Sequence, residues 1–174
     1  MSSETDFESL VNTFYPSLYR FAFSLTRDES EAGDLTQETF YIWAVKGHQL
    51  QDKTKVKSWL FTTLYRECLG RRRKLIRFPH LELAQVEDEL PEISPVASEC
   101  LDASSALRAL SKLNEAFQAP IALFYLEDYS YPEIAQILEI PLGTVKSRIS
   151  RGIAQLQRLM AEPKPHLSER QARE

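Results

Sequence analysis

The sequence predicts an all-α fold, with two small helical domains joined by a flexible acidic linker. Apolar residues recur at spacings of three and four along most of the 174 residues, and only five residues are glycine. Charge is segregated, because residues 53–77 hold nine Lys or Arg against one acid, whereas residues 81–105 hold seven acids and no Lys or Arg. Such a change of sign indicates two modules with a linker between them. We place the domains at residues 6–78 and 104–161, the linker at 79–103 and a disordered tail at 162–174.

The N-terminal domain is expected to contain three helices. The first begins near Asp6 and carries apolar residues at helical spacing, with Pro16 expected to kink or divide it. After a polar break, a second helix is expected over about residues 30–46, and its early acids suit the positive end of the helix dipole. A third helix, over about residues 56–74, ends in the basic run 71–74, which suits both a helix C-terminus and a phosphate backbone.

The linker and the start of the C-terminal domain differ in composition. Prolines and clustered acids oppose a packed helix in the linker, which is therefore expected to be a solvated tether. The C-terminal domain begins with a helix from about residue 104. A further helix is expected over about residues 114–127, bent at Pro120 or starting there.

Residues 130–152 predict a helix-turn-helix. Ser130 is a natural N-cap, and Glu133 three residues later completes a capping box. Pro141 and Gly143 mark the break before the second helix. One side of that helix is apolar: Val145, Ile149, Ile153 and Leu156. The opposite side carries hydroxyls and arginines without an acid: Thr144, Ser147, Arg148 and Arg151. Such a face suits the DNA major groove, although an ordinary helical hairpin with a solvated basic face would show the same pattern.

Other features argue against an enzyme, a metal site and a membrane protein. The N-terminus has no basic flank followed by an apolar run, and no segment is apolar for long enough to span a bilayer, so we expect a soluble, cytoplasmic protein without membrane insertion. Cys68 and Cys100 have no histidine at metal-ligand spacing, and the three histidines are scattered. No nucleophile motif or phosphate loop accompanies them, so we expect no catalytic residues, no metal and no cofactor.

Several motifs, in order and spacing, resemble the group IV or extracytoplasmic-function (ECF) sigma factors of bacterial RNA polymerase, in the sigma-70 family. Residues 34–40 resemble the Asp-x-x-Gln-Glu-x-Phe signature of region 2.2, and Trp59-Leu60-Phe61 with the basic run 71–74 resembles regions 2.3–2.4. Residues 124–135 and 143–148 resemble region 4. At Arg66 and Gly70 the chain departs from the Asn and Asp that family members often carry.

The resemblance implies a sigma factor that binds core polymerase and directs initiation at promoters with −35 and −10 elements. The residues implied to meet the β′ clamp helices are Asp34, Gln37 and Glu38. A loop at about residues 47–57 would capture a base flipped from the −10 strand. The basic residues implied to hold that strand are Lys53, Lys55, Lys57, Arg66, Arg71, Arg72, Arg73 and Lys74. The residues implied to contact the −35 element are Thr144, Lys146, Ser147, Arg148 and Arg151.

The resemblance also implies partners beyond the β′ subunit and promoter DNA. These are the β flap and an anti-sigma factor. The anti-sigma factor could hold the otherwise cytoplasmic protein at the inner membrane. Two alternative functions stay open from the sequence. One is a stand-alone helix-turn-helix regulator, which would bind duplex DNA without polymerase. The other is a sigma-like interaction protein without promoter-melting activity.

Overall fold

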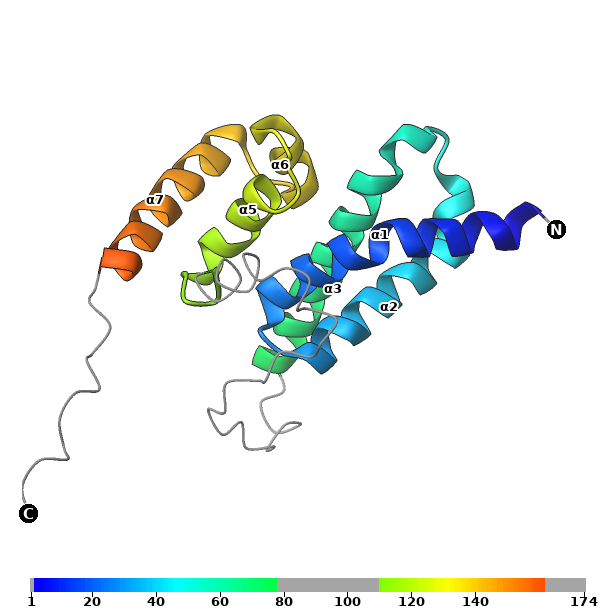
Figure 1. The fold of residues 1–174 in the computed structure, drawn as a ribbon, viewed down its shortest axis with the longest axis horizontal. Helices are drawn as coiled ribbons and strands as arrows, with labels where there is room; N and C mark the ends of the chain where they lie inside the picture. Colours follow the sequence, from blue (N-terminus) through cyan, green and yellow to red (C-terminus); the bar gives the residue numbers. More distant parts are fainter. Residues whose placement is uncertain (1, 78–109, 162–174) are drawn as a thin grey trace, which may run out of the picture.

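The computed structural model describes residues 2–77 and 110–161, and all the elements described are helical. The N-terminal domain consists of α1 (Ser2–Thr26), α2 (Glu29–Lys46) and α3 (Val56–Arg77), with the short 3₁₀ turns η1 (Gly47–Gln49) and η2 (Lys53–Lys55) between α2 and α3. The C-terminal domain contains α5 (Glu115–Tyr125), α6 (Tyr131–Leu138) and α7 (Leu142–Ala161). Figure 1 shows the two groups of helices side by side. The expected linker and tail lie outside the described residues, as does most of the helix expected from residue 104.

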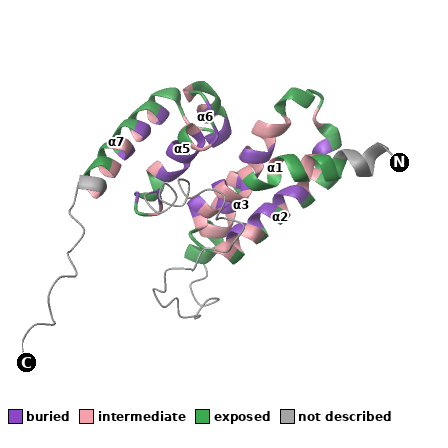
Figure 2. Ribbon diagram, in the orientation of Figure 1, coloured by how far each residue is buried: buried purple, intermediate pink, exposed green. Residues whose placement is uncertain are grey.

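The N-terminal domain has a core at the meeting point of its three helices. Leu18, Phe21, Leu35, Leu60 and Leu64 are all fully buried there. Figure 2 shows that the buried residues of α1, α2 and α3 lie on the sides that face one another, with exposed residues outward. The three-helix prediction for this domain is therefore confirmed in the structure.

Helix α1 continues through Pro16, so the expectation that this proline divides it is wrong. A proline removes the hydrogen bond to the carbonyl four residues earlier, which here belongs to Asn12. Both Pro16 and Asn12 are exposed. Water can therefore satisfy the freed carbonyl, and the helix tolerates the loss.

The connection between α1 and α2 confirms the predicted polar break. Arg27 adopts a left-handed conformation with φ 63°, and its N–H donates to the carbonyl of Phe23 at 2.9 Å. Asp28 then caps α2, because its carboxylate accepts from the N–H of Glu31 at 2.6 Å. These residues reverse the chain sharply and let α2 pack along α1.

The C-terminal domain is built around α5, whose central residues are buried on all sides. Ile121, Ala122 and Leu123 are at most 1% exposed, and Ile134 of α6 and Ile149 of α7 close over them. Pro120 lies inside α5 and is itself buried, so the helix neither starts nor ends there. Helix α5 begins instead at Glu115 and is capped by Asn114, whose side chain accepts from the N–H of Ala116 at 3.0 Å.

The helix-turn-helix is confirmed, but its turn is made differently from the expectation. Glu139, with φ 55°, is the left-handed residue that ends α6, and the N–H of Ile140 donates to the carbonyl of Ala135 at 3.1 Å. Pro141 accepts from the N–H groups that open α7. Gly143 lies within the first turn of α7 and does not have positive φ, so it is no part of the break. A carboxylate-bearing residue has taken the left-handed position that glycine usually occupies.

The two domains contact one another directly. Helix α1 packs against α5, and α3 packs against α6. Phe61 of α3 meets Tyr129, just before α6, in an edge-to-face contact with ring centroids 5.5 Å apart. A compact arrangement is thus present as well as the division into two domains that the charge pattern predicted.

Candidate nucleic-acid interface

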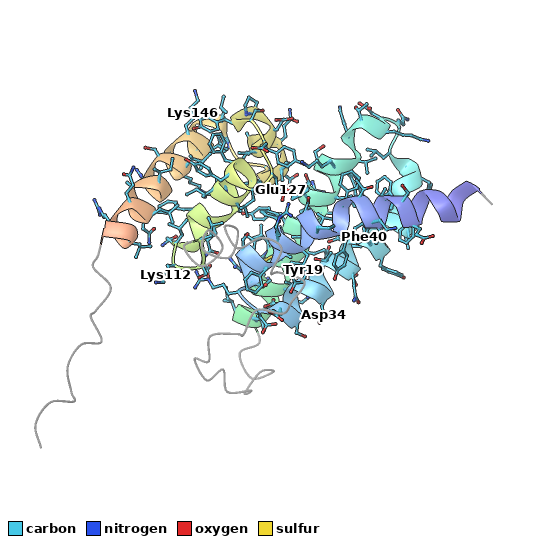
Figure 3. All side chains as sticks on the ribbon, viewed as in Figure 1. Tyr19, Asp34, Phe40, Lys112, Glu127 and Lys146 are labelled. Atoms are coloured by element: carbon cyan, nitrogen blue, oxygen red, sulfur yellow. The ribbon has the colours of Figure 1, made fainter. Side chains whose placement is uncertain are left out.

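Helix α7 presents the basic face that the sequence predicted. Val145 and Ile149 are buried against the domain, whereas Lys146, Ser147 and Arg151 are exposed and Arg148 is half-buried. Thr144 is also half-buried, and its carbonyl accepts from the hydroxyl of Ser147 at 3.0 Å. Helix α7 has no acid along its length. Figure 3 places Lys146 at the outer margin of the molecule, near the start of α7 and away from the N-terminal domain.

The capping box fixes the start of α6, the helix against which α7 packs. The carboxylate of Glu133 accepts from the N–H of Ser130 at 2.8 Å and from its hydroxyl at 2.5 Å. These two hydrogen bonds hold the pKa of Glu133 below its ordinary value. The capped helix then packs Ile134, Ile137 and Leu138 inward, and α7 rests on them.

The capping box predicts a dependence of stability on pH. The pKa of Glu133 is lower in the folded chain than in the unfolded one. Its contribution is therefore complete above the ordinary carboxyl pKa of about 4.3 and is lost as the pH falls through the folded value. We expect Glu133→Gln to lower the free energy of unfolding at about pH 7 by at most about 1 kcal/mol, since the group is exposed. The difference should shrink as the pH falls below the ordinary carboxyl range and through the folded pKa of Glu133, in urea titrations followed by circular dichroism. A difference that persists unchanged at acid pH would contradict this role, and Asp128→Asn serves as a neutral control.

The loop between α2 and α3 is shaped by an acid that the sequence reading overlooked. Asp52 accepts from the N–H of Thr54 at 3.0 Å and from its hydroxyl at 2.6 Å, and these bonds lower the pKa of Asp52. The cap leaves Lys53 and Lys55 exposed on η2. The signal was present as an Asp two residues before a Thr, which is an ordinary turn pattern.

Gly47, at the start of the same loop, lies against the indole ring of Trp43. A Cβ added to Gly47 would lie 2.6 Å from ring atoms of Trp43, so no larger residue fits without a shift. Trp43 in turn meets Trp59 edge-on, with ring centroids 5.1 Å apart. Both indoles pack against the core. The loop that carries Lys53 and Lys55 is therefore anchored on a rigid aromatic pair.

The structure does not bring the eight predicted −10 residues into one open patch. Arg73 and Lys74 are exposed at the end of α3. Lys57, Arg66 and Arg72 are instead engaged by carboxylates of the C-terminal domain: Glu127, Glu139 and Glu115, respectively. Arg71 lines an open hollow with residues of α2. The basic stretch thus divides among three environments, which the linear sequence could not reveal.

The residues predicted to meet polymerase share the outer side of α2. Asp34 and Gln37 are exposed and Glu38 is half-buried. They line the hollow that also includes Arg71 and Tyr41, whose ring is 65% exposed. Figure 3 shows Asp34 at the edge of the molecule opposite Lys146. The acidic and basic faces therefore lie on different sides of the chain and can be used at the same time.

Comparisons with known proteins show the family to which both domains belong. The family model for sigma-70 region 2 matches residues 10–78, and the model for sigma-70 region 4 matches residues 104–156. The chain belongs to the ECF sigma factors of the sigma-70 family. It is therefore a sigma factor, a class of non-enzymatic transcription factor that acts in promoter-specific initiation.

Relatives of this ECF sigma factor cover most of its length. It is 33% identical over 160 residues to the ECF RNA polymerase sigma factor SigE of Mycolicibacterium smegmatis, a match over 89% of this chain and 62% of that protein. It is 26% identical to SigW of Bacillus subtilis, covering 90% and 89% of the two chains. A solved structure of the Bartonella quintana sigma factor RpoE in complex with the anti-sigma factor NepR aligns with a TM-score of 0.75, at 29% identity, over 91% of this chain and 99% of that chain.

Two kinds of feature are absent from the described residues. Within residues 2–77 and 110–161, no helix has the length and apolar character needed to cross a bilayer. In the same ranges, no group of three or more His, Cys, Asp or Glu is placed to hold a metal ion. Cys68 is buried, and burial raises the pKa of its thiol.

Proposed function

We propose that this sigma factor docks on core polymerase through α2 and reads promoter DNA through α7 and the loop before α3. The observation that carries the proposal is the acid-free face of α7, held outward by Val145 and Ile149 in the segment that matches region 4. Helix α7 would lie in the major groove of the −35 element. Arginine paired with a guanine edge discriminates by roughly 1–3 kcal/mol, whereas contacts to phosphates fix position without reading sequence.

The proposed −10 contacts use the loop of residues 47–57. Lys53 and Lys55 are exposed where a single strand could pass, and the Trp43–Trp59 pair gives the loop a rigid base. Extruding a base costs a few kcal/mol of stacking and pairing, which a fixed pocket and nearby cations can offset. Arg73 and Lys74 continue the basic track along α3.

The proposed polymerase contacts use Asp34, Gln37 and Glu38. Their carboxylates would pair with basic residues of the β′ clamp helices, and the region 4 domain would meet the β flap. Charge pairs at such an interface mainly supply orientation and specificity. We also propose a cytoplasmic location and control by an anti-sigma factor. The support is the resemblance in shape to RpoE, which was solved with the anti-sigma factor NepR.

The experiment that tests the proposed function is transcription in vitro with core polymerase. We expect Arg148→Ala and Arg151→Ala each to lower promoter-directed transcription by roughly 10- to 100-fold if the side chain reads a base, and less if it contacts only phosphate. A promoter library selected with each variant separates the two roles, because only a base-reading arginine relaxes preference at one position. Arg158→Ala, at an exposed position near the end of the same helix, is the matched control. Wild-type levels of transcription by the double variant Arg148→Ala/Arg151→Ala would overturn the placement of α7 in the major groove of the −35 element.

A further inference from the structure

The hollow beside α2 holds more than the three residues proposed to meet polymerase. Its volume is about 400 Å³, and it is lined by Asp34, Gln37, Glu38, Tyr41 and Arg71. The first four residues lie on α2, whereas Arg71 reaches the hollow from α3, which packs against α2. Side chains carried by two packed helices have well-defined positions, so the hollow presents a fixed surface to a partner.

Arg71 brings an uncompensated charge to this hollow. It is half-buried, and within residues 2–77 and 110–161 its guanidinium has no ion-pair partner, although Asp34 and Glu38 line the same hollow. A guanidinium has five N–H donors and no acceptor, and solvent satisfies them in the free chain. A partner that covers the hollow removes that solvent, and an unpaired buried charge is costly. The partner must therefore supply an acceptor to Arg71.

The position of Arg71 favours the polymerase side of α3 over the DNA side. From Val56 to Arg71 the helix rises by about 22 Å, so Arg71 lies far from the loop that carries Lys53 and Lys55. Figure 1 shows the last turns of α3 beside the start of α2, at the end of the domain away from that loop. Arg73, two positions later, projects from the opposite side of the helix. The family resemblance implied a −10 contact for Arg71, whereas the geometry places it with the acids of α2.

Tyr41 adds an aromatic surface to the same hollow. Its side chain is 65% exposed, and it lies one turn after Glu38 and two turns after Asp34 on α2. A ring beside carboxylates suits a basic side chain, whose charge is attracted to both the carboxylates and the ring face. Exposed aromatic residues are also frequent among those that dominate the energy of an interface. Asp34, Glu38 and Tyr41 therefore form a subsite for one cation of a partner.

We propose that Tyr41 and Arg71 complete the polymerase-docking face: Tyr41 stacks on a cation of the partner, and Arg71 pairs with a carboxylate of the partner. This inference rests on the proposed function, because it takes the outer side of α2 to be the docking face. It specifies a partner surface that carries an acid among its basic residues. Opposite charges within one hollow also select one orientation of the partner, since the reversed alignment brings like charges together.

Reversing the charge of Arg71 tests the pairing by the sign of the effect. A uniformly basic partner would bind Arg71→Glu more tightly than the wild type, whereas a partner with a carboxylate at this place would be repelled. We expect Arg71→Glu to bind core polymerase at least about tenfold more weakly in a competition assay, and Arg71→Gln about three- to tenfold more weakly. Arg77→Glu, exposed at the end of the same helix and outside the hollow, is the matched control. Circular dichroism checks that each variant is folded, and unchanged or tighter binding by the Arg71 variants would overturn the proposal.

The role of Tyr41 is tested by separating its ring from its hydroxyl. Tyr41→Phe keeps the ring and should bind core polymerase within about twofold of the wild type. Tyr41→Ala removes the ring and should bind about 3- to 30-fold more weakly. Wild-type affinity of Tyr41→Ala, or an equal loss in both variants, would contradict stacking on a cation.

Titration of the sigma chain in transcription separates docking from DNA contact. With a fixed amount of core polymerase and a promoter selected from the library, Arg71→Glu should raise the concentration that gives half-maximal transcription and leave the plateau unchanged. A lower plateau at an unchanged half-maximal concentration would assign Arg71 to DNA and overturn this inference. The single variant Asp34→Lys identifies which idea has failed. If it weakens polymerase binding and Arg71→Glu does not, the proposed docking through α2 stands and only the role of Arg71 is wrong.

Discussion

Exchanging both Asp34 and Glu38 for lysine is expected to abolish association with core RNA polymerase while leaving the chain folded. The two carboxylates stand one helical turn apart on the outer side of α2, and within the described residues neither has an ion-pair partner. Their removal therefore costs the free protein little. At an interface, each close charge pair couples by roughly 1.5–7 kcal/mol, and reversal turns attraction into repulsion. We expect the affinity to fall by at least about a hundredfold.

The measurement is a competition assay in which each variant displaces labelled wild-type chain from core polymerase. Glu8→Lys is the matched control for each single reversal, since it places the same charge change on an exposed position of α1. The single variants Asp34→Lys and Glu38→Lys separate the contributions of the two carboxylates. A double variant that competes as well as the wild type would show that α2 does not carry the polymerase contact.

The elements that the sequence predicted well are those whose signals are local. Ser130 and Glu133 form the predicted capping box, and Val145 and Ile149 are buried as their spacing required. Helical periodicity likewise separates the exposed Asp34 and Gln37 of α2 from the buried Leu35 and Thr39. In each case a few neighbouring residues determine the outcome.

The predictions that failed or fell short needed tertiary context. Pro16 and Pro120 both lie inside unbroken helices, one with solvent at hand and the other packed into the core. Phe61 and Cys68 are both buried, and α3 is covered both by its own domain and by α6. Helical spacing in the sequence identifies one buried face of a helix. It does not reveal a second face that another domain covers.

The candidate site shows the same limit. The face of α7 followed from composition and period, but the engagement of Lys57, Arg66 and Arg72 depends on acids some forty to seventy residues away in the sequence. The net charge of −4 does not reveal that these three cations are paired. Only the packing of the C-terminal domain on α1 and α3 brings these groups together, so no linear pattern could have predicted these ion pairs.

Gly152→Ala is expected to destabilise the C-terminal domain. Gly152 is buried where α7 packs against α5. A Cβ there would sit 2.2 Å from Cδ1 of Ile121 and 3.0 Å from Cβ of Phe117. Ile121 is 1% exposed, so moving its Cδ1 would disturb its neighbours in the core, and the Cβ of Phe117 is fixed to the helix backbone. Either the Ile121 side chain or the spacing of α5 and α7 must therefore change, which we expect to lower the free energy of unfolding by about 1–3 kcal/mol.

Gly143→Ala is the matched control, because it is the same substitution in the same helix at a position where a Cβ would meet nothing within 4 Å. Alanine is the better helix former, so this control should be neutral or stabilising by up to about 1 kcal/mol. Thermal and urea unfolding followed by circular dichroism measures both variants. A change in the spacing of α5 and α7 would also move the face that carries Arg148 and Arg151, so we expect Gly152→Ala to reduce promoter-directed transcription even at temperatures where it remains folded. Equal stability of the two alanine variants would show that α5 and α7 do not meet as closely as Gly152 requires.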